Sequence, residues 1–161
     1  MQMHLSANLS IVHDMPNPSP AAVTAWARLL RVARSLTEGA EEALKEAGMP
    51  PLAWYDALHE IAEAGEEGLR PFQLPERLLL AQYNVSRLLA RLEAEGLVEK
   101  REVAGDGRGQ TIRITRAGRD MRRRMWSVYG PEIARIEDRL SSDDLAMLTR
   151  LLGRLRDPAA P

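Results

Sequence analysis

The segment from Leu80 to Thr115 constrains the fold of this chain more than any other. It predicts a helix from about Gln82 to Glu95, because apolar residues recur there at the i, i+3, i+4 and i+7 spacing of one helix face. Gly96 stands where a helix C-cap belongs, and an extended segment from Leu97 to Val103 follows. The apolar positions of this predicted helix are Val85, Leu88, Leu89 and Leu92.

A glycine-rich turn and a second extended segment come next. Residues 104–110 contain three glycines, one Asp and one Arg, and Thr111–Thr115 alternates polar with apolar side chains. Ile112 and Ile114 therefore face one way and Arg113 the other. A helix followed directly by a hairpin is typical of a winged helix-turn-helix. In that fold the helix enters a major groove of DNA, and the hairpin tip reaches the adjacent minor groove or backbone.

Two motifs at this spacing make the resemblance to one family specific. The phrase VSRLLARLEAEGLVEKR is followed by D-x-R-x-x-x-I-x-I-T-x-x-G, and together they resemble the multiple-antibiotic-resistance regulator (MarR) family of bacterial transcription factors. The resemblance extends from about Pro20 to Leu155. It implies a mainly α fold with a small β-wing in a single domain, residues 19–156. The winged helix-turn-helix lobe would occupy about 51–115, and the dimerisation helices about 19–48 and 116–156.

Composition excludes several other classes of protein. A chain of 161 residues is about one domain, and the absence of cysteine excludes disulfides, thiolate metal sites and cysteine nucleophiles. No apolar run approaches the roughly 18 residues of a membrane span, and the N-terminal sequence is not that of a signal peptide. We therefore expect a cytoplasmic protein without membrane contact. Residues 1–18 lack periodicity and are expected to form a flexible arm.

The net charge of −1 conceals an asymmetry along the chain. Residues 1–69 have four Lys or Arg against ten Asp or Glu, residues 70–124 have thirteen against seven, and residues 125–161 have five against six. The positive charge therefore lies where the winged-helix motif lies. A basic patch favours a polyanionic partner, and a solvated charged face is the alternative interpretation.

The helices that flank the motif follow from start and stop signals. Ser19-Pro20 opens a helix that continues to Gly48, and a second helix is expected from about Pro51 to Ala64. The segment Leu69–Leu79 should be the first helix of the helix-turn-helix. Pro75 falls inside it, and a proline beyond the first turn costs up to about 3 kcal/mol, so this helix should be short or distorted.

Two further helices are predicted after the wing. Thr115 is a plausible N-cap for a long helix to about Leu140, kinked at Gly130-Pro131, and residues 141–144 start a last helix with a leucine stripe. We expect no further domain to cover the apolar stripes of the first helix and the last two. A homodimer through the terminal helices is predicted from these stripes, and the resemblance implies the same. The stripe of the last helix comprises Leu145, Leu148, Leu151, Leu152 and Leu155.

The candidate DNA contacts lie on the predicted recognition helix and wing. Arg87 has no acidic neighbour on its face, whereas Arg91 has a competing interpretation as an i, i+4 pair with Glu95. The D-x-R element of the wing resembles the family's minor-groove Arg and the Asp that organises it. Arg113 is expected to contact a phosphate or to be solvated. The full set is Gln82, Tyr83, Asn84, Ser86, Arg87, Arg91, Asp106, Arg108 and Arg113.

The resemblance also implies a pocket between the dimerisation helices and the DNA-binding lobe. Trp26, Trp54, Tyr55 and His59 are the candidate lining, and a small aromatic or phenolic ligand would suit them. Core packing is the alternative for both tryptophans. On the second helix an acidic run around His59 has the i, i+3, i+4, i+7 spacing of a metal site, and a solvated helical face is the favoured interpretation. We therefore predict neither a metal nor a cofactor. That run is Asp56, His59, Glu60 and Glu63.

These observations predict a sequence-specific DNA-binding transcriptional regulator. We expect a ligand-responsive repressor that acts as a homodimer on a pseudo-palindromic operator in double-stranded DNA. The alternative from another class is a winged-helix module for protein interaction without DNA, which would need neither Arg108 beside Asp106 nor an outward Arg87. No catalytic or nucleotide-binding motif supports an enzyme.

Overall fold

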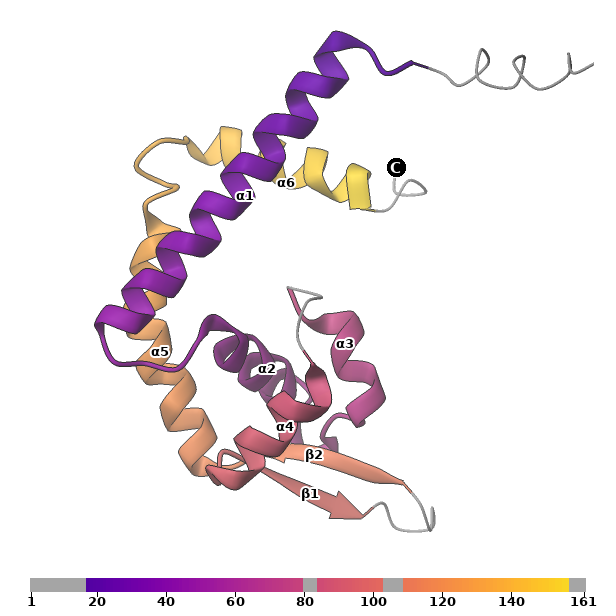
Figure 1. The fold of residues 1–161 in the computed structure, drawn as a ribbon, viewed down its shortest axis with the longest axis vertical. Coiled ribbons are helices and arrows are strands. Elements are labelled where there is room, and N and C mark those ends of the chain that lie inside the picture. The colour runs from indigo at the N-terminus through magenta and orange to yellow at the C-terminus, as the bar shows by residue number, and fades with distance from the viewer. Residues whose placement is uncertain (1–16, 80–83, 103–108, 157–161) are drawn as a thin grey trace, which may run out of the picture. The chain divides into compact units, whose positions relative to one another are not determined.

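A computed structural model of the 161-residue chain describes residues 17–79, 84–102 and 109–156 (Figure 1). The chain divides into two units, residues 1–36 and 37–161, and each is described by itself. The second unit is mainly helical with one two-stranded antiparallel sheet, which confirms the predicted fold class. Within the described ranges no helix combines the length and the apolar character needed to cross a membrane.

The elements are numbered in chain order. They are α1 (Pro20–Glu46), α2 (Leu52–Glu63), the 3-10 turns η1 (Gly65–Glu67) and η2 (Pro71–Gln73), α3 (Leu74–Arg77), α4 (Val85–Ala94), β1 (Val98–Glu102), β2 (Gln110–Ile114), α5 (Arg116–Ala134) and α6 (Ser142–Arg156).

Three helices begin at the side-chain caps that the sequence predicts. The Oγ of Ser19 accepts a hydrogen bond from the N–H three residues on at 3.1 Å, and the Oγ1 of Thr115 does the same at 3.0 Å. Ser141 and Asp144 form a reciprocal pair, in which each side chain accepts from the backbone N–H of the other at 3.2 and 3.1 Å. The hydrogen bonds from Ser141 hold the pKa of the exposed Asp144 carboxyl below its usual value.

Two predicted helix boundaries are wrong. The recognition helix α4 begins at Val85 instead of about Gln82, because Asn84 is extended (φ −71°, ψ 93°) and caps the helix. Helix α5 ends at Ala134 instead of continuing to about Leu140. Pro131 lies within its last turn, where it has no N–H to donate to the preceding turn, and the chain turns soon afterwards.

The first helix of the helix-turn-helix is short, as predicted. It comprises the turn η2 followed by the four residues of α3, and prolines stand in the first turn of each. Gln73 reaches back so that its Oε1 accepts from the N–H of Arg70 at 3.0 Å. Prolines are tolerated at these positions because first-turn N–H groups have no intrahelical partner.

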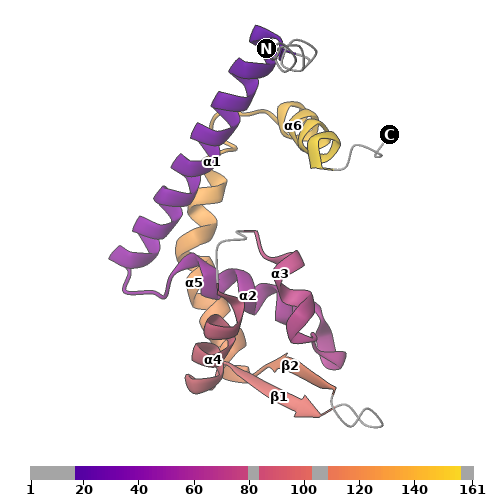
Figure 2. The ribbon, with the colours of Figure 1, turned by 45° about the vertical axis from the view of Figure 1, so that its right-hand side comes forward.

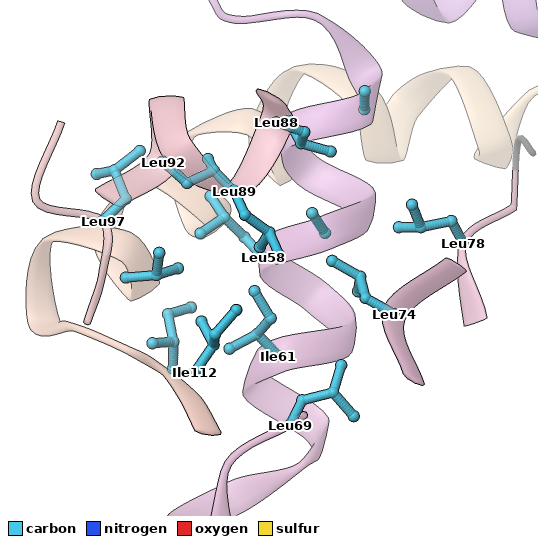
Figure 3. Close-up of a cluster of buried hydrophobic side chains, with 14 residues drawn as sticks. Leu58, Ile61, Leu69, Leu74, Leu78, Leu88, Leu89, Leu92, Leu97 and Ile112 are labelled. Carbon is cyan, nitrogen blue, oxygen red and sulfur yellow. The ribbon is translucent and has the colours of Figure 1, made fainter. Parts of the chain in front are cut away.

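The core of the winged-helix lobe forms around α2 (Figure 3). Leu58 and Ile61 of α2 are fully buried, and leucines from α3 and α4 and isoleucines from β2 surround them. The two strands pair in the register Val98↔Ile114. Leu69 adds a single bridge on the other side of β2, with both backbone hydrogen bonds to Ile112 at 2.8 and 2.9 Å. This one-residue strand has no periodicity, so the sequence did not predict it.

A smaller cluster joins the C-terminal end of α1 to α5 and α2 within the second unit. Leu44 and Met125 are fully buried in it, with Ala40 and Leu52 beside them. Figure 2 shows α5 running beside α2. The cluster agrees with that view, because it contains Leu52 of α2 and Met125 of α5. The long helix α5 therefore holds both the wing, through its first turn, and the end of α1.

Gly118, in the first turn of α5, provides a test of this packing. A Cβ at this position would lie 2.1 Å from the carbonyl oxygen of Leu97 and 2.8 Å from Cγ1 of Ile114, so Gly118→Ala should lower the free energy of unfolding by about 2 kcal/mol or more. Gly39→Ala is the matched control, because its methyl meets only Glu132 Oε2 at an ordinary 3.8 Å and should stabilise the helix by up to about 1 kcal/mol. Chemical denaturation of both variants measures the difference. Equal stability for the two would show that α5 does not start against Leu97.

Candidate nucleic-acid interface

Helix α4 separates into a buried and an exposed face, as its sequence predicts. Leu88, Leu89 and Leu92 are buried in the lobe core, and Val85 is half-buried beside them. The opposite face is exposed and combines polar, basic and small residues. It consists of Ser86, Arg87, Ala90, Arg91 and Ala94.

Asn84 has a defined structural role at the start of α4. Its Oδ1 accepts a hydrogen bond from the backbone N–H of Arg87 at 3.0 Å. Such a cap contributes about 1 kcal/mol to helix stability. Asn84 is a predicted DNA contact, and its side-chain oxygen already caps the helix. Its amide N–H groups remain for other partners.

Two guanidinium groups on this face have no partner among the residues that the structure describes. Within the described part of the chain, the side chains of Arg87 and Arg91 make no ion pair or hydrogen bond. The competing pair of Arg91 with Glu95 is therefore not formed. Arginines elsewhere do find acids: Arg101 lies 2.8 Å from Glu99. A free guanidinium is a strong, planar donor for phosphates and for guanine edges.

A hollow of about 280 Å³ lies between the start of α2 and α4. Arg87 and Arg91 both line it, so they flank the side of α4 that faces α2. Trp54 lines the same hollow and also packs against both apolar clusters. The complete lining is Pro51, Ala53, Trp54, Asn84, Arg87, Leu88 and Arg91. The structure thus brings three predicted DNA contacts together, and it places Trp54, predicted for a ligand pocket, beside them.

The wing strands carry basic residues whose charges are partly neutralised. Lys100 on β1 lies 2.6 Å from Glu93 of α4, which ties the wing to the recognition helix. Arg113 on β2 is half-buried, with its Nη1 3.7 Å from Oε2 of Glu66. Its Nε is buried and has no hydrogen-bond partner among the described residues. Arg113 is therefore held at the base of the wing, whereas Arg87 and Arg91 of α4 have no ion pair within the described ranges.

Four predicted DNA contacts lie outside the described residues. They are Gln82, Tyr83, Asp106 and Arg108.

An aromatic cluster forms between α2 and α5, away from the core residues of α2. The Tyr55 ring stacks on His59 at 5.9 Å and on Trp126 at 5.8 Å, and it meets Tyr129 edge-on at 5.2 Å. Tyr55 and His59 are predicted residues, whereas Trp126 and Tyr129 were missed. Their i, i+3 spacing on α5 is the sequence signal, since it places both rings on one face. Trp26 belongs to the first unit, where it is 65% exposed.

The guanidinium of Arg122 lies at the edge of this aromatic cluster. Nη1 of Arg122 is 3.2 Å from Nδ1 of His59 and 3.5 Å from Oε1 of Glu63. Burial raises the pKa of the Tyr55 phenol, and the positive charge of Arg122 opposes that rise. Burial, with a smaller contribution from the Asp56 carboxylate, also raises the pKa of Tyr129. The two phenols are therefore neutral at physiological pH and can donate hydrogen bonds.

The side chains of the acidic run around His59 do not come together at one point. Among the described residues, no three His, Asp or Glu side chains are arranged to hold a metal ion. Asp56 is buried on α2, whereas His59 is engaged with Tyr55 and Arg122.

Comparison with known proteins identifies the winged-helix segment. Residues 47–109 match the model of the MarR family. This range contains α2, α3, α4 and β1. It includes the whole first motif and the start of the second, and it confirms the resemblance over these residues.

The fold agrees with that of solved transcriptional regulators. Sco3205, a MarR family regulator of Streptomyces coelicolor solved in complex with DNA, is similar at a TM-score of 0.78 and 24% identity, over 92% of this chain and 94% of that one. A mutant MarR of E. coli complexed with operator DNA is similar at a TM-score of 0.69 and 23% identity, over 83% of this chain and 94% of that one. The organohalide-sensing regulator RdhR bound to 2,4-dichlorophenol is similar at a TM-score of 0.72 and 19% identity, over 94% of this chain and 90% of that one. At these identities the likeness establishes the fold.

Proposed function

We propose that this chain, whose residues 47–109 are a MarR-family winged-helix segment, is a cytoplasmic transcriptional regulator that binds specific DNA as a homodimer. The observation that carries the proposal is the pair of guanidiniums of Arg87 and Arg91 on the exposed face of α4, which have no partner among the described residues. The DNA complexes of Sco3205 and of E. coli MarR, two proteins of this fold, support it. The family is one of transcription factors, in keeping with a protein that is not an enzyme.

The exposed face of α4 fits a major groove. Ala90 and Ala94 are small, so the helix axis can approach the base edges closely, and Arg87 and Ser86 flank them. Arg87 is proposed to bind guanine, which presents two acceptors to a guanidinium in that groove. Arg91, farther round on the flank beside α2, is proposed to contact a phosphate. Arg108 is proposed to enter the minor groove from the wing.

A homodimer is proposed from the exposed apolar residues of the terminal helices. α1 exposes Val23, Trp26 and Leu30, and α6 exposes a stripe that includes Leu148 and Leu152. Contiguous apolar surface of this kind marks an interface. Two copies related by a twofold axis would present two α4 helices to half-sites about 34 Å apart, which requires a pseudo-palindromic operator.

The chain is also proposed to be a repressor that responds to a small aromatic ligand. The cluster of Tyr55, Trp126 and Tyr129 offers aromatic surface, and Arg122 at its edge offers a positive charge. An aromatic carboxylate or phenol would match both. The dichlorophenol complex of RdhR is an example of such a ligand in a protein of this fold. We propose that ligand binding releases the operator.

Variants of Arg87 and Arg108 test DNA binding. Arg87→Ala should reduce the difference in affinity between operator and unrelated DNA by about 1–3 kcal/mol, because a base contact is lost. Arg108→Ala should weaken binding to all sequences similarly and lower the salt slope by about one charge. Gel shifts with the DNA upstream of the chain's own gene, at two salt concentrations, measure both effects. Arg139→Ala removes the same charge outside α4 and is the control. Full operator affinity in both test variants would favour the protein-interaction alternative.

Leu148→Asp tests the dimer. It places a charge on the exposed stripe of α6, so sedimentation should show monomer where the original chain shows a two-chain species at micromolar concentration. Ala146→Asp adds the same charge on the opposite face of α6 and should leave the dimer intact. A folded monomer for the unaltered chain would disprove the dimer.

Fluorescence tests the ligand site. An aromatic carboxylate such as salicylate should quench tryptophan emission, and Trp126→Phe should abolish most of that response because Trp126 stacks in the cluster. Arg122→Gln should weaken carboxylate binding about tenfold and affect a neutral phenol less. The ligand must also lower DNA affinity by the factor by which DNA lowers ligand affinity. A quench that Trp126→Phe leaves unchanged would place the ligand elsewhere.

A further inference from the structure

Asp56 is an unusual residue for its position on α2. Among the residues that the structure describes, it is the one buried residue with a charged or polar side chain, at 3% exposure. Ala53 and Ala57 are buried beside it on the same helix. A carboxylate in such surroundings costs free energy, and an apolar side chain would cost less. Asp56 must therefore supply a specific interaction.

One such interaction is with the end of the first helix of the helix-turn-helix. Oδ2 of Asp56 accepts a hydrogen bond from the backbone N–H of Leu79 at 2.7 Å, across 23 residues of sequence. The chain leaves α3 at this point, since Leu78 is extended (φ −63°, ψ 138°). A length of 2.7 Å is typical of a charge-assisted bond, which is about twice as strong as a neutral one.

The bond is part-buried and joins α2 to the chain just beyond α3. Its effect is geometric, because it ties the exit from α3 to α2. Only residues 80–84 separate this tie from the start of α4 at Val85, and α4 packs on the same helix through Leu88 and Leu92.

We infer that Asp56 is a positioning residue for DNA recognition, whose carboxylate ties the end of α3 to α2 and so sets the angle at which α4 is presented to DNA. This inference rests on the proposed function. It assigns no contact with DNA to Asp56, since the side chain is buried.

Removal of the Asp56 carboxylate should change operator affinity in opposite directions, depending on whether the group acts through its charge or by positioning α4. Loss of a negative charge should strengthen binding to any DNA. Loss of positioning should instead weaken operator binding and leave binding to unrelated DNA unchanged or stronger. The comparison uses Asp56→Ala, which has no acceptor, and Asp56→Asn, whose amide oxygen can still accept from Leu79. Glu60→Ala, on the same helix, is the control for charge.

Gel shifts of the full-length chain with operator and unrelated DNA are the experiment. Asp56→Ala should bind the operator at least about tenfold more weakly, Asp56→Asn should remain within about threefold of the original, and Glu60→Ala should not weaken binding. Unchanged operator affinity in Asp56→Ala would overturn the inference. An equal loss on both DNAs by a folded Asp56→Ala variant would also overturn it, because a positioning effect is confined to the operator.

Amide hydrogen exchange at Leu79 decides the matter where Asp56→Ala fails to fold. In the unaltered chain this amide should exchange at least about tenfold more slowly than an unbonded one, and in Asp56→Asn it should exchange faster. Unprotected exchange in the unaltered chain would overturn the inference. If the unaltered chain binds no DNA, the proposed function fails, and the exchange rate still shows whether Asp56 holds the turn.

Discussion

The burial of α2 in the winged-helix lobe is the interaction on which the rest of the structure depends. Leu58 and Ile61 of α2 are fully buried in a cluster that also contains residues of α3, α4, β1 and β2. Burial of one such side chain contributes about 1.5–3 kcal/mol. The wing, the short α3 and the recognition helix are each too small to be stable alone. Their positions therefore follow from the shape of the α2 surface on which they pack.

The same helix carries the proposed ligand site on another face. Tyr55 and His59 lie one turn apart on α2 and meet α5, whereas Leu58 and Ile61 face the core. Asp56, between these faces, is bonded to the end of α3, and its charge contributes to the raised pKa of Tyr129. A small displacement of α2 relative to α5 would thus reach the recognition helix through packed and hydrogen-bonded contacts. In the proposed regulator, this arrangement would be a physical route by which a ligand alters DNA affinity.

Local patterns predicted much of the fold because they depend on nearby residues. The spacing of leucines in α4 sets its buried face whatever the rest of the chain does, and the caps at Ser19, Thr115 and Ser141 are satisfied within three residues. The short α3 followed from prolines alone. The start of α4 was predicted too early, because Asn84 suits a helical face and a cap equally well from sequence, and its extended backbone decides between them.

The sequence by itself determined the order of helices and hairpin, the basic character of the winged-helix segment and the exposed position of Arg87 and Arg91. Each is set by periodicity or by local charge. Only the tertiary structure decided which distant groups meet: Leu69 with Ile112, Tyr55 with Trp126, and Asp56 with Leu79. Such contacts join residues far apart in the chain through the packing of whole elements. No local spacing encodes them, because they depend on how α2, α3, α5 and β2 pack against one another.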